Sequence, residues 1–112
     1  MPLSIAEISR VVDALEVEIN NGGFDQYFYN AAGGDAQIAL EALGQIGAHH
    51  TAAILQGAMA KFPDGAPAIE RAARQAQLAE ISPESDAFES EDKAFLAYVE
   101  NPARLVQAYS ST

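Results

Sequence analysis

Apolar residues at the start of the chain recur with the spacing of one helix face and then stop at a run of asparagine and glycine. The members of this stripe, three or four residues apart, are Ile5, Ile8, Val12, Leu15 and Ile19. Ser4 and Glu7 have the spacing of a capping box, which predicts that the helix begins there. The sequence NNG at residues 20–22 predicts its end, because Asn and Gly tolerate the left-handed backbone of a helix terminus.

A short second helix is expected directly after this stop, over residues 23–31. Phe24, Tyr27 and Phe28 lie at i, i+3 and i+4, so they share a face that belongs in the core. An Asn-Gly pair also occurs in β-hairpins, but helical spacing on both sides argues against one. A phosphate-binding loop is excluded, because no Gly-Lys-Ser/Thr follows. We therefore interpret Gly22 and Gly23 as a tight corner between two helices.

Five further helices are predicted from apolar spacing, glycine and proline. The first is capped by Asp35 and ends near Ile46, and the second covers residues 49–62. The third starts at Pro67, the fourth covers residues 90–99, and the last has Asn101 and Pro102 at its start. Residues 79–92 are expected to be mostly loop. The residues expected to face inward are Ile38, Ala39, Ala42, Leu43, Ile46, Ile54, Leu55, Ala58, Met59, Phe62, Ile69, Ala72, Ala73, Ala76, Leu78, Phe95, Leu96, Tyr98, Leu105, Val106 and Tyr109.

No segment shows the sustained alternation of apolar and polar residues that is typical of strands. We therefore predict an all-α fold, a compact single domain of about six to seven short helices over residues 1–112.

Negative charge is the strongest signal in the composition. Sixteen Asp and Glu face six Lys and Arg, for a formal net charge of −10. Such a surface repels nucleic acid and anionic lipid, so we expect no direct nucleic-acid binding. It attracts basic proteins and speeds encounter with them, although excess acid also serves solubility alone.

Cysteine is absent, which excludes disulfides and Cys-ligated zinc and fits a cytoplasmic protein. The first residues, MPLSIAEISR, lack a basic segment followed by a long apolar run, which predicts no signal peptide. The most apolar region, residues 38–59, contains charged and polar residues and predicts no membrane span.

Three segments carry a distinctive motif: EINNGGFDQYFYN (residues 18–30), ALEALGQIGA (39–48) and AILQGAMAKFPDG (53–65). Together they resemble the DNA-mimic protein family of small helical domains, over residues 13–109. The matching residues are Glu18, Asn21, Gly22, Gly23, Phe24, Gln26, Tyr27, Phe28, Asn30, Ala42, Leu43, Ile46, Gly47, Ala48, Phe62 and Pro63, with Arg71, Phe95 and Tyr109 matching more loosely. The resemblance implies an all-α fold and, in the family's namesake, acidic side chains that replace phosphates on the DNA-binding face of a transcription regulator.

The motif residues Gly22, Gly23, Phe24, Gln26, Tyr27, Phe28 and Asn30 are interpreted as mainly structural. Gln26 and Asn30 are one helical turn apart, so their amides project together. We expect them to bond backbone groups left open at the helix ends. The alternative is a polar recognition patch.

DNA mimicry depends instead on carboxylates at the protein surface. Carboxylates one helical turn apart are about 6 Å from each other, which is comparable with the spacing of phosphates along a DNA strand. A first group, opposed by Arg10, is Glu7, Asp13, Glu16, Glu18 and Asp25. A second group, beside Lys93, is Glu80, Glu84, Asp86, Glu89, Glu91 and Asp92. All of these except Glu80 are taken as candidate partner-binding residues. The alternative for the second group is a solvated loop.

The sequence shows no clear pattern of catalytic or metal-binding residues. His49 and His50 point about 100° apart on a helix, which does not suit chelation. Glu16 and Glu18 face different ways, and Ser82, Ser85 and Ser90 have no histidine in a nucleophile pattern. We expect no enzyme activity, no metal and no cofactor.

We predict an acidic protein-interaction module that presents carboxylates as phosphate surrogates to a basic DNA-binding protein, such as a transcription regulator. One alternative is an inhibitor or immunity-type partner of a basic enzyme such as a nuclease, which an exposed Tyr29 among the acids would favour. Another is a small-ligand domain that uses Gln26, Asn30 and Tyr27 in a pocket beside the glycine corner. Association into a homodimer is left open.

Overall fold

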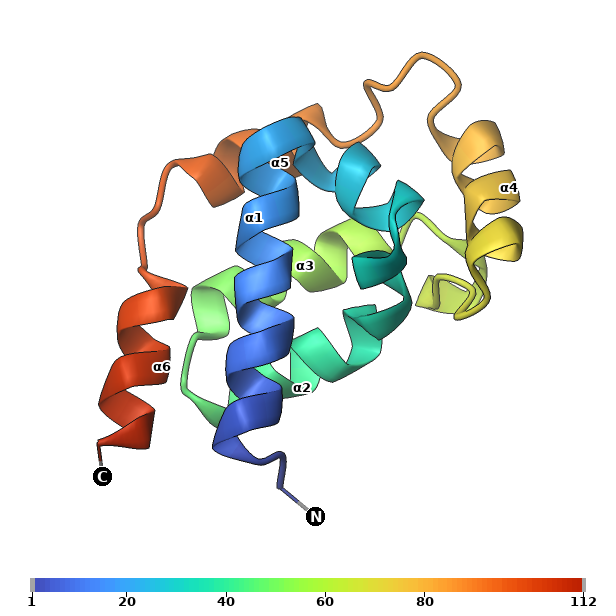
Figure 1. Ribbon diagram of the computed structural model, residues 1–112. Coiled ribbons are helices and arrows are strands. Elements are labelled where there is room, and N and C mark those ends of the chain that lie inside the picture. The colour runs from blue at the N-terminus through green and yellow to red at the C-terminus, as the bar shows by residue number, and fades with distance from the viewer. Residues whose placement is uncertain (1, 112) are drawn as a thin grey trace.

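The structure, a computed structural model, describes residues 2–111 and is built from helices joined by short connections (Figure 1). The elements are α1 (Ile5–Tyr29), η1 (Ala31–Asp35), α2 (Ala36–Gln45), α3 (His49–Met59), η2 (Pro63–Gly65), α4 (Arg71–Ile81), α5 (Glu89–Leu96) and α6 (Pro102–Ser110), where η denotes a 3₁₀ turn. No strand occurs within residues 2–111, so the predicted all-α class is confirmed. Met1 and Thr112, the ends of the predicted domain, lie outside the described residues.

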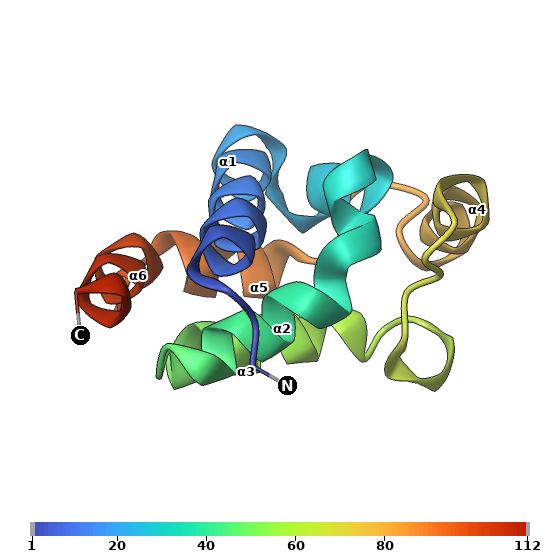
Figure 2. The ribbon, with the colours of Figure 1, turned by 60° about the horizontal axis from the view of Figure 1, so that its bottom comes forward.

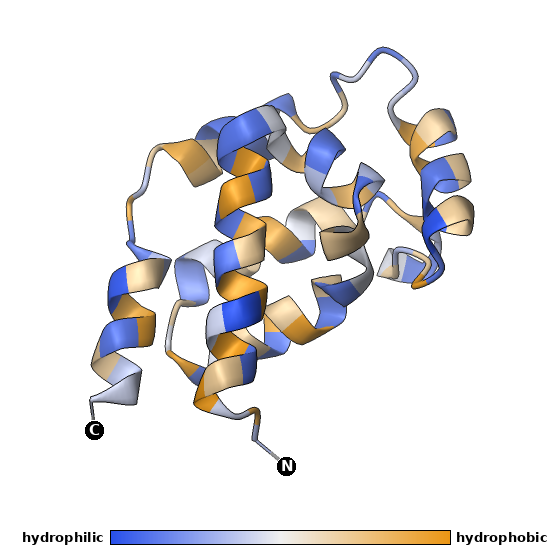
Figure 3. Cartoon of the chain, in the orientation of Figure 1, coloured by the Kyte–Doolittle hydropathy of each residue, from blue (hydrophilic) through white to orange (hydrophobic). Residues whose placement is uncertain are grey.

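Helix α1 is the centre of the packing. It contacts η1, α2, α4, α5 and α6, while α3 packs against α2 and α5. Turning the molecule shows α1 lying over the layer formed by α2, α3 and α5, with α4 and α6 at opposite ends (Figure 2). Apolar and polar sectors alternate along α1, as expected of a helix with one buried face (Figure 3). Ile8, Val11, Val12, Leu15 and Ile19 form that face, whereas Ile5 is exposed.

The predicted corner is present within α1. Ser4 caps the helix by accepting the Glu7 amide hydrogen at 3.1 Å. The helical backbone is interrupted at Gly22 and Gly23, and Gly23 has φ 73° and ψ −171°. Only glycine adopts that conformation readily, so the break must fall where the sequence places a glycine.

An aromatic cluster holds the corner in the core. Phe24 contacts Tyr27, Phe28, Phe88 and Phe95, with ring centroids 5.9–6.4 Å apart. Phe28 also contacts Phe62 and Phe88, at 4.7 Å and 5.4 Å between centroids. Phe88, fully buried, comes from the segment that was expected to be mostly loop. This short connection therefore supplies a core residue as well as charge.

The expectation for α4 was wrong for its start and for four of its five inward residues, while the fifth, Leu78, is buried as expected. The helix begins at Arg71, not near Pro67, because the Glu70 carboxylate caps the amides of Ala72 and Ala73. The expected inward residues Ile69, Ala72, Ala73 and Ala76 are exposed. The buried residues of α4 are Arg74 and Leu78.

Smaller corrections concern other helix ends. Asp35 occupies the cap position of α2 but makes no capping bond, because its carboxylate pairs with Arg10 at 2.8 Å. Helix α3 ends at Met59, before the expected Phe62, and α5 spans 89–96 rather than 90–99. Leu96 and Tyr98 are exposed, although both were expected to be buried. The predicted start of α6 is confirmed, since Asn101 accepts the Arg104 amide hydrogen and Pro102 follows it.

Candidate functional site

The glycine corner brings Asp92 of α5 against α1. The Asp92 carboxylate accepts the Phe24 amide hydrogen at 2.7 Å. This bond satisfies a backbone donor at the start of the helical turn that follows Gly23. Burial raises the pKa of Asp92, while the hydrogen bond from the Phe24 amide lowers it. The negative charges of Asp25, Glu91 and Glu89 raise the pKa further. Asp92 therefore has a structural role inside a group of like charges.

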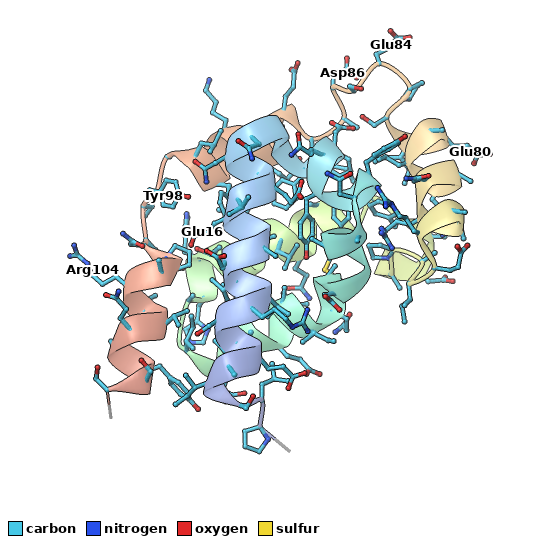
Figure 4. The ribbon with its side chains drawn as sticks, viewed as in Figure 1. Glu16, Glu80, Glu84, Asp86, Tyr98 and Arg104 are labelled. Carbon is cyan, nitrogen blue, oxygen red and sulfur yellow. The ribbon has the colours of Figure 1, made fainter. Side chains whose placement is uncertain are left out.

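Asp25 belongs with the acids of the second group rather than with those of the first helix. It lies near Asp92, and it lines a groove together with Ser85 of the α4–α5 connection. Figure 4 shows the neighbouring Glu84 and Asp86 on that connection, and Glu80 on α4. We call Asp25, Glu84, Asp86 and Glu89 the corner acidic surface. No salt bridge or hydrogen bond engages these four carboxylates within the described part of the chain.

Glu18, expected among the partner-binding acids, is bound inside the molecule. Its Oε2 accepts hydrogen bonds from Gln26 Nε2 at 2.8 Å and from Asn30 Nδ2 at 2.9 Å. Asn30 Oδ1 in turn accepts from Arg71 at 3.2 Å. The two amides thus bond a carboxylate, not the backbone groups that we expected. The network joins both segments of α1 to α4, which explains why these residues occur together in the motif.

The remaining acids of the first group lie beside α6. Asp13 and Glu16 line an open groove of about 470 Å³ between α1 and α6, which also includes Arg10. Glu16 accepts a hydrogen bond from the Tyr98 hydroxyl at 3.2 Å, and burial raises its pKa. Figure 4 shows Glu16 and Tyr98 on the side of α1 that faces α6, away from Glu80, Glu84 and Asp86. Glu7 sits near the start of α1, so the first group does not form one surface.

Most of the negative charge is not neutralised by the protein's own cations. Among residues 2–111, ion pairs join only Arg10 to Asp35, at 2.8 Å, and Lys61 to Glu91, at 3.5 Å. Arg10 lies near the first group, but its ion pair is with Asp35, which is outside that group. Glu91 is partly buried and pairs with Lys61. Arg71 bonds the Tyr29 carbonyl and Asn30, and Lys93 and Arg104 are exposed.

Arg74, which the sequence reading missed, is the most deeply buried charge. Its side chain is fully buried and donates to the carbonyls of Phe28, Asn30, Ala68 and Ile69 at 2.7–3.0 Å. Two of these carbonyls are at the C-terminal end of α1, where the helix dipole favours a cation. The signal available in the sequence was the position of Arg74, one helical turn before Leu78 on the buried face of α4.

The structure also shows the residues that distinguish the alternative functions, namely an inhibitor, a small-ligand domain and a metal site. Tyr29 is 54% exposed and lines the groove beside the corner. Tyr27 is buried in the core, so its hydroxyl is not available to a ligand in that groove. His49 and His50 are exposed, and the described residues contain no cluster of three His, Cys, Asp or Glu side chains arranged to hold a metal. None of the helices within residues 2–111 is both long and apolar enough to cross a bilayer.

The surroundings of Asp92 lead to a pH prediction. Its raised pKa means that the native state binds this proton more tightly than the unfolded chain does. Protonation of Asp92 therefore favours the native state at acidic pH, and this contribution to the free energy of unfolding is lost as the pH rises through the native pKa of Asp92. We expect Asp92→Asn, which keeps an acceptor for the Phe24 amide, to be more stable than the parent at neutral pH by up to about 1 kcal/mol, since solvent screens a partly exposed group.

Urea unfolding followed by circular dichroism across the acidic to neutral range measures this difference. The advantage of Asp92→Asn should shrink as the pH falls and Asp92 of the parent becomes protonated. Glu41→Gln, which removes an exposed charge on α2, should show no comparable trend. An advantage for Asp92→Asn that is constant with pH would contradict the role assigned to the like charges.

Comparison with known proteins identifies a family. A family model described as DMP19-like protein matches residues 5–112, nearly the whole chain. No curated protein and no solved structure matches the chain.

Proposed function

The chain belongs to the DMP19-like protein family, and we propose that it is an acidic protein-interaction module that acts as a DNA mimic. Its carboxylates stand in for phosphates and engage a basic DNA-binding protein, such as a transcription regulator. The family name supports this proposal, as does the sign of the charge, which suits a protein that normally binds phosphate.

One observation carries the proposal: most of the acids have no cation partner, although several, such as Glu18 and Asp92, accept internal hydrogen bonds. Of sixteen Asp and Glu residues, only Asp35 and Glu91 form ion pairs in the described structure. A protein that used its acids only for internal stability would be expected to pair more of them. Free carboxylates give a long-range negative potential that steers a basic partner into contact.

The surface that we favour for this contact is the corner acidic surface. Glu84, Asp86 and Glu89 are exposed, and Asp25 is partly exposed. Glu18 and Asp92 are held by internal hydrogen bonds, so moving them to a partner would disturb the corner. Glu7, Asp13 and Glu16 lie on other parts of α1 and would provide a second, separate contact.

Capture from cell extract tests the proposal. The immobilised protein is exposed to lysate and eluted with rising salt, and the released proteins are identified by mass spectrometry. We expect one dominant basic DNA-binding protein, which is released at moderate salt because exposed charges are screened within about 8 Å at physiological ionic strength. Duplex DNA should displace it. Retention that ignores both salt and DNA would contradict mimicry.

Charge variants locate the surface. Glu84→Gln combined with Asp86→Asn should weaken binding of the captured protein about tenfold, since two exposed charges each contribute up to about 1 kcal/mol. The matched control, Glu41→Gln with Asp64→Asn, removes two exposed charges elsewhere and should have a much smaller effect. The loss should fall mainly on the association rate measured by surface plasmon resonance. Equal losses in the two double variants would point to net charge rather than to this surface.

A second candidate function is favoured by Tyr29. Its half-exposed ring beside Asp25 is the kind of aromatic anchor found in tight protein inhibitors. In that case the captured protein would be a basic enzyme such as a nuclease, and the purified chain would inhibit its activity. The small-ligand alternative is weakened, because Gln26 and Asn30 already bond Glu18 and Tyr27 is buried.

A further inference from the structure

The groove beside the glycine corner combines an apolar wall with acceptors. It lies between the second segment of α1 and α4 and has a volume of about 390 Å³. Its lining residues, which we call the corner groove, are Asp25, Gln26, Tyr29, Gln75, Leu78, Ala79, Ser82 and Ser85. Pockets that take small organic groups typically have volumes of about 300–1,000 Å³, so this groove suits one side chain rather than a large ligand.

The one charged side chain that lines the corner groove, Asp25, is an acceptor. The Asp25 carboxylate has no hydrogen bond or ion pair to any residue that the structure describes. Gln75 donates its amide to the Tyr29 carbonyl at 2.9 Å, which leaves its side-chain oxygen as an acceptor. Ser82 accepts the Ala87 amide hydrogen and keeps its hydroxyl hydrogen as a donor. Because Asp25 is the only charged side chain in the lining and has no cation partner among the described residues, a cationic donor is better matched to the groove than an anion.

The walls of the corner groove are apolar. Leu78 is almost completely buried beneath it, Ala79 is exposed, and the Tyr29 ring is half exposed. Outside the groove, Glu80 follows Ala79 in the chain, and Glu84 and Asp86 flank Ser85 (Figure 4). The nearby cations are occupied, since Arg71 bonds Tyr29 and Asn30 and Arg74 is buried. The groove thus carries an aromatic surface, one free carboxylate and a rim of acids.

We propose that the corner groove binds a single arginine side chain of the basic partner, an inference that rests on the proposed function and names its anchor. A guanidinium has five donors, no acceptor and a planar face. It can bond the Asp25 carboxylate in a bidentate manner and stack on Tyr29, while its aliphatic stem covers Leu78 and Ala79. Lysine offers the charge but neither the planar face nor the paired donors, so it binds more weakly.

The experiment uses a short capped peptide, Ac-Gly-Ser-Arg-Ser-Gly-NH₂, and not the partner protein. The isotopically labelled full chain is titrated with the peptide at millimolar concentrations and followed by amide chemical shifts. Peptides with lysine or citrulline in place of arginine are the matched probes, because citrulline has nearly the shape of arginine without its charge. We expect the largest shifts at Asp25, Tyr29, Ala79 and Ser85, with clearly weaker binding of lysine and none of citrulline.

Two variants test the assigned contacts. Tyr29→Ala and Asp25→Asn should each weaken arginine-peptide binding about fivefold or more, in line with a cation–π contact and a charge-assisted hydrogen bond. Both replace side chains without internal hydrogen bonds, and unchanged amide spectra elsewhere verify the fold. The controls Val99→Ala and Asp64→Asn remove an exposed apolar group and an exposed acid from other places and should leave binding unchanged.

Shifts spread over all exposed acids, equal binding of citrulline, or full affinity in Tyr29→Ala would overturn the proposed anchor. The proposed function fails differently. If the peptide binds the corner groove but no captured protein is displaced by DNA, the arginine site is supported and DNA mimicry is contradicted. If such a protein is captured and binds Tyr29→Ala normally, and the peptide does not bind the groove, DNA mimicry is supported and the arginine site is contradicted.

Discussion

Replacing Arg74 with methionine is expected to lower the free energy of unfolding by about 3–5 kcal/mol, since it leaves one buried and three part-buried carbonyls without their donor, and a fully buried group left unpaired costs about 1–3 kcal/mol. The fully buried guanidinium donates to four carbonyls, two from the end of α1 and two from the segment before α4. Methionine fills a similar space but donates nothing. Relief from burying a cation, whose pKa is lowered by that burial, offsets only part of the loss.

Urea unfolding of the parent and of the variant measures this effect. Arg71→Met is the matched control, because Arg71 is exposed and its two hydrogen bonds are long, at 3.2 Å. It should cost less than about 1 kcal/mol, as exposed polar contacts do. Arg74→Lys keeps the charge but lacks the planar fork, so it should recover little of the stability. A tolerated Arg74→Met would show that solvent or a rearranged backbone satisfies the four carbonyls.

The close packing around Arg74 explains the two glycines that follow α1. A Cβ atom added to Gly33 would lie 2.6 Å from the Tyr27 carbonyl oxygen and 2.9 Å from Arg74 Nε. One added to Gly34 would lie 3.1 Å from the Ile69 carbonyl oxygen. Both glycines therefore allow the chain to pass close to the guanidinium.

Local spacing was sufficient to predict much of the fold. The start of α1, the glycine corner and the buried faces of Phe24, Tyr27 and Phe28 each depend on residues within one or two helical turns. Helix α4 was mispredicted because Arg74, and not an apolar residue, accompanies Leu78 on its buried face. Carbonyls more than forty residues away in the chain make that burial favourable, and no local apolar pattern records them. Phe88 was missed for a related reason, since it stands alone among polar residues.

The acids show what sequence can and cannot indicate about the candidate surface. Their excess and their approximate positions are evident from the residues alone. Whether a carboxylate is free depends on tertiary contacts: Glu18 is bound by Gln26 and Asn30, and Asp92 is bound by the Phe24 amide. Asp25 joins the corner acidic surface only because the corner turns the chain toward α5. The proposed surface is therefore a consequence of the corner's geometry.

The corner itself supplies the second large effect. Gly23→Ala is expected to destabilise the protein by about 3 kcal/mol, because a backbone conformation that is nearly exclusive to glycine costs about 1–3 kcal/mol and the loss of the part-buried, charge-assisted hydrogen bond between Phe24 and Asp92 adds to it. Gly23 has φ 73° and ψ −171°. An added Cβ would also lie 2.5 Å from Asp92 Oδ2, which forces the carboxylate away from the Phe24 amide.

A double-mutant cycle separates the two causes. In the Asp92→Ala background the carboxylate is gone, so Gly23→Ala should then cost only the backbone strain, and the difference is the coupling between the two sites. Gly57→Ala is the control: Gly57 is inside α3 with nothing within 4 Å of an added Cβ, and the change should stabilise the protein by about 0.5–1 kcal/mol. If Gly23→Ala is as benign as Gly57→Ala, the corner is not held by this glycine. If its cost is unchanged without Asp92, strain alone accounts for it, and the contact with α5 does not contribute to shaping the corner acidic surface.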